Sequence, residues 1–272
     1  MIDNYTHENN NIIYVIESIP GPKESSQEYD EIINNFNSQL TDHCLCQQSC
    51  LKNECRCLEK LKTTNYVPYI KNKHMSVLNL DNGELSSNII IECNDLCSCS
   101  NECGNRVVQK GPIEGLNIKK CQDEAKGLGL FSECHLPKGM FVCEYAGEVI
   151  TKSEAIMRHQ MNAAQNKMNY ILCLQEHSAG NLLQWFVDPS KFGNIGRYIN
   201  HSCEPNCCII PVRVNTPIPK LAIFTCSDIL PNTEITFDYG SFNNDNISEN
   251  INRSKCLCNS KNCMEWMPYH VY

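Results

Sequence analysis

The residues best suited to chemistry in this sequence are nine cysteines that fall in two tight clusters between residues 44 and 103. They are Cys44, Cys46, Cys50, Cys55 and Cys57, followed by Cys93, Cys97, Cys99 and Cys103. Cysteine thiolates are ligands of tetrahedral zinc, at Zn–S distances of about 2.3 Å. Disulfides are the alternative, but nine is an odd number and a bridge within a Cys-x-Cys pair is strained. The clusters therefore favour metal binding.

The number of these cysteines also constrains how many metal ions they can hold. Nine sulfurs cannot fill separate four-ligand sites, because nine is not a multiple of four. If three sulfurs each bridge two ions, the cluster supplies twelve ligand positions, which is enough for three zinc ions. The surrounding segment is too polar to build an apolar core, so metal binding would take the place of that core. We expect a closed, structural role with no open position for a substrate.

A third cluster lies near the C-terminus and consists of Cys256, Cys258 and Cys263. Three thiolates leave a structural zinc site one ligand short, so the fourth ligand must come from elsewhere in the chain. Spacing alone leaves open which other cysteine supplies it. Most of the remaining cysteines lie in apolar runs, where a thiol acts as a small buried hydrophobic group.

The composition narrows the kinds of partner and compartment. The 272 residues include 23 Lys plus Arg against 31 Asp plus Glu, for a formal net charge of -8. This balance does not favour a basic nucleic-acid-binding face, and it suits a cationic partner such as a Lys/Arg-rich peptide tail. No apolar run predicts a membrane span, and the N-terminus lacks the features of a secretory signal. Without export to an oxidising compartment, metal thiolates are favoured over disulfides.

The elements that must position these residues are expected to be mainly short β-strands. Strands are predicted at residues 140–145, 184–188 and 220–225. A helix is predicted over residues 152–168, and a shorter one over residues 29–40. The second helix belongs to a polar N-terminal segment, which we expect to be either a flexible arm or an arm packed on an edge of the fold.

Three further motifs give the chain a family identity. They are Lys126-Gly-Leu-Gly-Leu130, Arg197-Tyr-Ile-Asn-His-Ser-Cys-Glu-Pro-Asn206 and Glu234-Ile-Thr-Phe-Asp-Tyr239. In this order, and between a nine-cysteine and a Cys-x-Cys-x4-Cys cluster, they resemble the SET-domain lysine methyltransferases with pre-SET and post-SET modules. The resemblance covers residues 44–272, and five features in register make it very specific.

Four shorter stretches resemble one branch of this family, in which the methyltransferase is fused to a transposase. They are Glu92-Cys-Asn-Asp-Leu-Cys-Ser-Cys99, Arg106-Val-Val-Gln-Lys-Gly111, Gly193-Asn-Ile-Gly-Arg197 and Ile210-Pro-Val-Arg213.

The resemblance implies a mainly β fold and a set of domain boundaries. The SET domain is a set of small sheets with a pseudoknot, in which a C-terminal segment threads under a loop. An N-terminal arm would span residues 1–43, a pre-SET triple-zinc module residues 44–111, and the SET catalytic domain residues 112–240. A mobile linker over residues 241–255 would lead into a post-SET zinc module over residues 256–272.

The resemblance also completes the C-terminal zinc site. In this family the Asn-His-Ser-Cys segment supplies the missing ligand, which here would be Cys203. The expected metal content is then three zinc ions in the pre-SET module and one in the post-SET module. Trp266 would close the cofactor pocket once the post-SET zinc site has folded.

The cofactor implied by the family is S-adenosylmethionine. The residues expected to bind it are Lys126, Gly127, Leu128, Gly129, Tyr170, Arg197, Asn200, His201 and Trp266. Glycines let the backbone approach a ligand closely, and an Asn side chain offers both a donor and an acceptor to a zwitterion. Leu128 departs from the family pattern, which usually has Trp there. We expect cofactor binding to be retained, with some loss of stacking.

Tyr239 is the expected catalytic residue, with Tyr170 as its partner and Phe237 as the determinant of the product. A lysine amine must attack a sulfonium methyl in line, so the site must hold two reactants at opposite ends of a narrow channel. A phenol can orient the amine by hydrogen bonding, whereas the identity of a general base stays open. Phe237 leaves room where a Tyr hydroxyl would hold a water and block rotation of a methylated amine. We therefore expect di- or trimethylation.

The expected function is methyl transfer to a histone H3 lysine, with lysine-9 favoured because the nine-cysteine module accompanies that specificity in the family. The expected partners are the H3 tail and chromatin, without membrane or sequence-specific DNA binding, in the nucleus and on the chromosome. Two alternatives are methylation of a non-histone protein and an inactive zinc-stabilised chromatin scaffold. The presence of Tyr239, Tyr170, Asn200 and His201 argues against the scaffold, because a decayed enzyme would be free to lose them.

Overall fold

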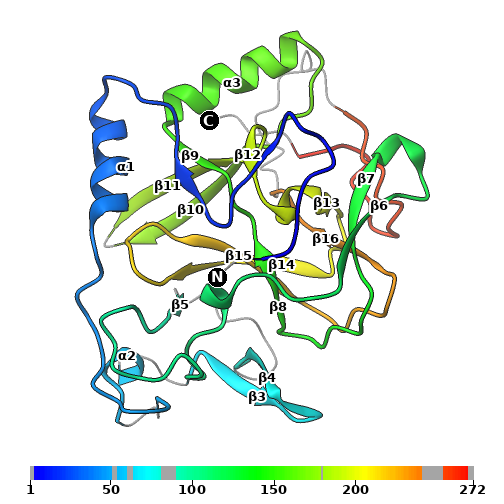
Figure 1. Cartoon of the computed structure of the whole chain (residues 1–272). Coiled ribbons are helices and arrows are strands. Elements are labelled where there is room, and N and C mark those ends of the chain that lie inside the picture. The colour runs from blue at the N-terminus through cyan, green and yellow to red at the C-terminus, as the bar shows by residue number, and fades with distance from the viewer. Residues whose placement is uncertain are drawn as a thin grey trace.

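The computed structural model describes residues 3–50, 54–59, 64–80, 90–178, 180–240 and 254–268. Within these residues the fold is mainly β, as predicted, with short sheets and few helices (Figure 1). No helix in the described part of the chain is long and apolar enough to cross a bilayer. The predicted mobile linker falls largely on residues 241–253, which lie outside the described residues.

The largest sheet has a strand order in which the last strand is inserted between two earlier ones. Its path is β6 (Leu116–Lys120), β7 (Leu128–Ser132), β16 (Glu234–Phe237), β14 (Cys207–Arg213), β15 (Lys220–Thr225) and β8 (Phe141–Glu144). Strand β13 (Asn200–His201) pairs in parallel with β16, so that Asn200 faces Thr236 and His201 faces Phe237. Two motifs far apart in the sequence, which share no hairpin, therefore lie side by side.

The second sheet supports the other side of the molecule. Its order is β10 (Leu172–Ser178), β11 (Asn181–Asp188), β9 (Glu148–Ile150) and β2 (Ile19–Pro20). Helix α3 (Lys152–Ala164) follows β9 and runs along the top of the molecule in Figure 1. It begins where the Thr151 hydroxyl accepts a hydrogen bond from the Glu154 N–H at 3.1 Å, which caps the helix.

The helix predicted over residues 152–168 is present but ends at Ala164, so the predicted C-terminus was wrong. Asn166 adopts a left-handed backbone conformation, with φ of 51°, which turns the chain out of the helix. Residues 165–171 consequently form a loop between α3 and β10, and this loop borders the cavity described below.

The N-terminal arm is packed on the edges of the fold. Strand β1 (Ile13–Tyr14) pairs in parallel with β12 (Phe192–Gly193), and β2 pairs with β9. The short helix predicted over residues 29–40 is α1 (Gln27–Asn37), which begins earlier because the Ser26 side chain caps it. Of the two arrangements expected for the arm, the described residues therefore adopt the packed one.

The predicted strands are confirmed, and their apolar side chains build the core. Residues 140–145 contain β8, residues 184–188 end β11, and residues 220–225 form β15. The main hydrophobic cluster lies beneath the paired motifs and includes the fully buried Ile199, Ile235 and Phe237.

A second apolar cluster joins the hairpin of β3 (Tyr66–Tyr69) and β4 (Asn72–Leu78) to the main sheet. The Phe224 ring lies 6.3 Å from Tyr66 and 5.5 Å from Phe141, measured between ring centroids. The short strand β5 (Ile90–Ile91) pairs with β14 and carries the chain from the second cysteine cluster onto the sheet.

The Glu92 carboxylate fastens the cysteine-rich region to this part of the fold. Glu92 is 1% exposed and accepts hydrogen bonds from the Tyr66 hydroxyl at 2.8 Å and from the Val107 and Val108 N–H groups at 2.9 and 2.7 Å. These amides open the short 3-10 helix η1 (Val108–Lys110), whose first N–H groups would otherwise lack partners.

Glu92→Gln should therefore destabilise the fold. The amide nitrogen of Gln can donate but not accept, so it would face an N–H or O–H donor, and hydrogen bonds to charged groups contribute about 1.5–3 kcal/mol each. We expect the melting temperature to fall by about 5 °C or more, measured by circular dichroism. Glu102→Gln is the matched control, because Glu102 is 87% exposed and pairs with Lys110 only at 3.5 Å. Equal melting temperatures for the two variants would contradict this role.

Candidate active site

The two N-terminal cysteine clusters meet in space, although a Cys-free stretch separates them in the sequence. Three sets of four sulfurs lie with all their atoms within 4.8 Å of one another. These sets are Cys44–Cys50–Cys55–Cys93, Cys44–Cys57–Cys93–Cys97 and Cys50–Cys93–Cys99–Cys103. The cysteines form their own buried cluster together with Leu58, separate from the apolar cores.

The spacing of these sulfurs suits metal ligands. The Sγ atoms of Cys44 and Cys50 are 3.5 Å apart, and those of Cys50 and Cys93 are 3.6 Å apart. A tetrahedron with 2.3 Å bonds has edges of about 3.8 Å, whereas a disulfide requires about 2.05 Å. All twenty cysteines are free thiols. The prediction of zinc-binding clusters is therefore supported, and the disulfide alternative is excluded.

The sets share members in a regular way. Cys93 belongs to all three, while Cys44 and Cys50 each belong to two. Cys46 is the one predicted ligand that joins no set, although it is half-buried and packs against the cluster. A buried guanidinium, that of Arg106, lies 3.5 Å from the Cys99 sulfur and donates to the Cys93 and Asn94 carbonyls.

The C-terminal cluster forms a fourth set, in which Cys203 joins Cys256, Cys258 and Cys263. Cys203 and Cys256 are 3.8 Å apart at their sulfurs. The neighbouring Glu204 carboxylate accepts a hydrogen bond from the Lys261 N–H at 3.0 Å and so holds the C-terminal segment against the loop after β13. Spacing in the sequence left the fourth ligand open, and the family resemblance implied Cys203. The fold brings the Cys203 sulfur beside the other three.

The seven remaining cysteines belong to none of these sets. Cys121, Cys143 and Cys207 are buried, as predicted for thiols in apolar strands. Cys134 is exposed, and Cys173, Cys208 and Cys226 are half-buried. Burial and the Glu234 charge raise the pKa of Cys121 to about 11, so this thiol is uncharged at neutral pH.

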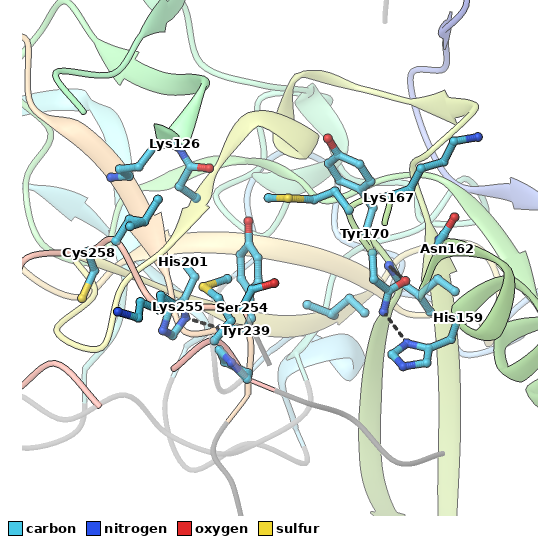
Figure 2. A pocket seen from close by; sticks show the side chains of 18 of the residues that line it. Lys126, His159, Asn162, Lys167, Tyr170, His201, Tyr239, Ser254, Lys255 and Cys258 are labelled. Atoms are coloured by element: carbon cyan, nitrogen blue, oxygen red, sulfur yellow. Dashed lines mark hydrogen bonds between the residues drawn. The ribbon is translucent and has the colours of Figure 1, made fainter. Parts of the chain in front are cut away.

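A cavity of about 530 Å³ lies between the paired motifs, the loop after α3 and the C-terminal segment (Figure 2). The predicted catalytic and cofactor-binding residues that line it are Lys126, Tyr170, Asn200, His201, Phe237 and Tyr239, and the predicted zinc ligand Cys258 also lines it. Five others do not line it, namely Gly127, Leu128, Gly129, Arg197 and Trp266. Figure 2 shows Lys126 and His201 on one side, and the α3 residues His159 and Asn162 on the other.

The Gly-Leu-Gly turn does not line the cavity, but it packs against residues that do. A Cβ atom on Gly129 would lie 2.8 Å from the Cys121 sulfur and 3.2 Å from the Asn200 Nδ2 atom, so only glycine fits there. Gly127 has φ of 71°, which favours glycine. The Leu128 side chain is 42% exposed, while its carbonyl accepts a hydrogen bond from Asn200 at 3.1 Å.

Glu234 organises the polar side of the cavity. Its two carboxylate oxygens accept from the Asn200 Nδ2 atom at 2.8 Å and from the Lys126 ammonium at 2.5 Å. Because the Asn200 amide nitrogen is held by Glu234 and Leu128, its orientation is fixed and its oxygen remains available to a ligand. Glu234 opens one of the three family motifs, but its role becomes apparent only from these contacts in the fold.

Aromatic side chains form a second wall of the cavity. The Tyr239 ring lies 4.8 Å from Phe237, and Phe237 lies 5.8 Å from Tyr145, measured between centroids. The Tyr239 hydroxyl donates to the Ile199 carbonyl at 2.8 Å, and the Tyr145 hydroxyl donates to the Tyr170 carbonyl at 2.6 Å. Burial raises the pKa of both Tyr239 and Tyr145, so both phenols stay protonated.

Arg197 and Trp266 lie outside the cavity lining. The Arg197 guanidinium stacks on the ring of Tyr170 at 4.7 Å, which holds a lining residue in place. Trp266 is 37% exposed and is bridged to Lys255, whereas its neighbours Met267 and Pro268 line the cavity. These contacts bring the C-terminal segment up to the cavity.

Several lining residues escaped the sequence analysis. Tyr145 ends the predicted strand 140–145, where its position after a largely apolar run resembles that of any core tyrosine. His159, Asn162 and Lys167 come from α3 and its following loop. They carry no local motif, and only the position of the loop beside the cavity identifies them.

Comparison with known proteins defines the class of this chain. The family profile described as "SET domain" matches residues 127–240, and that described as "Pre-SET motif" matches residues 2–106. The inserted β16 strand, the paired motifs and the cysteine sets agree with these matches. The molecule is thus a SET-domain protein with a pre-SET motif.

Relatives and solved structures identify the family. Rat SETMAR (Rattus norvegicus), a histone-lysine N-methyltransferase, is 40% identical over 83% of this chain and 72% of its own length. The "Probable histone-lysine N-methyltransferase set-23" of Caenorhabditis elegans is 37% identical over 92% of this chain and 94% of its own length. The methyltransferase domain of human SETMAR superposes with a TM-score of 0.74 at 33% identity, covering 99% of this chain and 93% of that domain. The chain belongs to the SET-domain histone-lysine N-methyltransferases.

The chain spans 33% of the human SETMAR protein. KRYPTONITE, solved in complex with mCHH DNA, H3(1-15) peptide and SAH, has the same fold, with a TM-score of 0.72 at 23% identity over 98% of this chain and 50% of that one.

Proposed function

We propose that this enzyme uses S-adenosylmethionine to di- or trimethylate lysine-9 of histone H3 on chromatin in the nucleus. The observation that carries the proposal is the cavity that Tyr239, Phe237 and Tyr145 line together with the polar Asn200 and Lys126. The nine-cysteine module, which accompanies lysine-9 specificity in the family, supports this choice of lysine. The acidic balance of the chain, with a formal net charge of -8, suits a basic histone tail.

The polar wall is proposed to hold the cofactor, which when bound supplies an electrophilic methyl group. Asn200, oriented by Glu234, presents its amide oxygen to the amino-acid end of the cofactor. Lys126 and Arg197 add positive charge near that end, and His201 borders its adenine end. The Gly127–Gly129 turn is proposed to bring its backbone close to the cofactor. Trp266 is proposed to approach the cofactor from the C-terminal segment.

The aromatic wall is proposed to orient the substrate amine. The Tyr239 hydroxyl already donates to the Ile199 carbonyl at 2.8 Å, so its oxygen can accept a hydrogen bond from the amine. Tyr170 is its proposed partner in placing the amine, and Arg197 stacks on its ring. Because burial raises the pKa of Tyr239, its phenol acts by orientation rather than as a preformed base. Holding the amine in line with the methyl group of the cofactor would then lower the barrier to methyl transfer.

An array of methyl-accepting peptides tests the substrate. We expect wild-type protein with labelled S-adenosylmethionine to label H3 peptides that contain lysine-9, and not peptides in which this lysine is replaced by arginine. Tyr239→Phe should reduce transfer by about a hundredfold or more, since it removes the hydroxyl that orients the amine. Labelling of non-histone peptides alone would favour a different substrate. No labelling of any protein would favour a scaffold.

Phe237→Tyr should change the product rather than the rate of the first transfer. The added hydroxyl would occupy space beside Tyr145 and hinder a methylated amine from turning for a second transfer. We expect mass spectrometry to show dimethyl and trimethyl peptide reduced by about tenfold or more relative to monomethyl peptide. Phe131→Tyr, on a half-buried ring that does not line the cavity, is the control. Strictly monomethyl product from the wild-type protein would refute the assignment.

The metal content is proposed to be three zinc ions in the nine-cysteine cluster and one in the C-terminal set. The proposed bridging ligands are Cys44, Cys50 and Cys93, which recur among the sulfur sets. Cys46 is proposed to bind the same zinc ion as Cys44, Cys50 and Cys55. Elemental analysis should then find about four zinc ions per chain, and about three in Cys258→Ser. Removal of the fourth ion should abolish methyl transfer with the circular dichroism spectrum retained. A wild-type content of about two would overturn this assignment.

A further inference from the structure

The His201 imidazole lies between two parts of the site that are otherwise described separately. Its side chain is 3% exposed, and both of its ring nitrogens have close neighbours. The Nδ1 atom accepts from the Tyr239 backbone N–H at 3.2 Å, as the dashed line in Figure 2 marks. The Nε2 atom lies 3.3 Å from the sulfur of Cys203, which belongs to the C-terminal sulfur set.

These contacts determine which nitrogen carries the proton. A backbone N–H can only donate, so Nδ1 must accept and carries no hydrogen. In a neutral imidazole the other nitrogen is then protonated, and Nε2–H points to the Cys203 sulfur. The Asp238 carboxylate also lies near Nδ1, at 3.5 Å. A hydrogen on Nδ1 directed toward Asp238 would, however, oppose the Tyr239 N–H. The imidazole therefore donates to the Cys203 sulfur and accepts from the Tyr239 amide.

Tyr239 depends on the segment around His201 at both its backbone and its side chain. The Tyr239 hydroxyl donates to the carbonyl of Ile199, two residues before His201. The pairing of β13 with β16 ends at His201 opposite Phe237, and the next hydrogen bond joins the Ser202 N–H to the Phe237 carbonyl at 3.1 Å. Beyond this point, the imidazole links the Tyr239 backbone to the segment that leads to Cys203.

We propose that His201 is a positioning residue that couples the C-terminal metal site to Tyr239. A zinc-bound Cys203 sulfur would remain a thiolate and accept the Nε2–H, which fixes the ring and aims Nδ1 at the Tyr239 amide. Loss of the metal would release the ring and, with it, the backbone that carries the phenol. This inference rests on the proposed function, in which Tyr239 orients the amine and zinc occupies the C-terminal set.

Two variants separate the two hydrogen bonds. In His201→Gln the side-chain amide reaches the position of Nε2 and can still donate to Cys203. In His201→Asn the shorter side chain places an oxygen near the position of Nδ1 and can still accept from Tyr239. The first readout is the rate of zinc release to a colorimetric chelator, with Cys258→Ser identifying the phase that belongs to the C-terminal set. The second is the kcat for methyl transfer with both substrates saturating.

The two readouts should rank the variants in opposite orders. We expect His201→Asn to release the C-terminal zinc about tenfold faster than wild-type protein, and His201→Gln to stay within about threefold of it. His201→Gln should lose more kcat than His201→Asn when both are measured with zinc bound. The same ranking in both readouts would overturn the coupling, because a ring that merely fills space would affect both through packing.

A measurement on the wild-type protein keeps the inference testable if either variant fails to fold. The imidazole nitrogen NMR shifts should show His201 with Nε2 protonated and Nδ1 unprotonated, and the opposite tautomer would refute it. Failure of the proposed function is distinguishable, because wild-type protein would then transfer no methyl group whereas the zinc-release and tautomer results would stand by themselves.

Discussion

The site depends on a parallel pairing of two short strands that are far apart in the sequence. Strand β13 carries Asn200 and His201, and β16 carries the motif that begins at Glu234 and leads to Tyr239. Because β16 is inserted between β7 and β14, this pairing cannot shift without disrupting the main sheet. The polar wall and the aromatic wall of the cavity are thereby held in one register, and the distance between them is set by backbone rather than by flexible side chains.

Sulfur clusters occupy the two ends of the fold where apolar side chains are scarce. The nine-cysteine region contributes Leu58 as its one fully buried aliphatic residue within the described part of that cluster, so metal binding must supply the ordering that a hydrophobic core gives elsewhere. Its attachment to the catalytic sheet combines the hydrogen bonds of Glu92, the pairing of β5 with β14 and the apolar cluster around Phe224. The C-terminal set is built differently, because its ligand Cys203 belongs to the catalytic domain itself.

The fold class, the metal ligands and most residues of the two walls could be predicted from the sequence, because motif order and thiol spacing are local signals. What could not be predicted depends on three-dimensional proximity. Glu234 orients Asn200 from a strand that is adjacent only in the sheet, and Tyr145 reaches the cavity from the end of β8. The C-terminus of α3 was misjudged because Asn166, a polar residue without a following proline, stops the helix by adopting a left-handed conformation.

The edge packing of the N-terminal arm has a consequence for how the chain folds during synthesis. Ile13 pairs with Phe192, and Ile19 pairs with Glu148, so this segment must wait for partners that are synthesised more than a hundred residues later. Such contacts close long loops, and proteins rich in them fold slowly. In the meantime the apolar run from Ile12 to Ile16 has no native partner, which makes the nascent chain a natural client for chaperones until residue 193 has emerged.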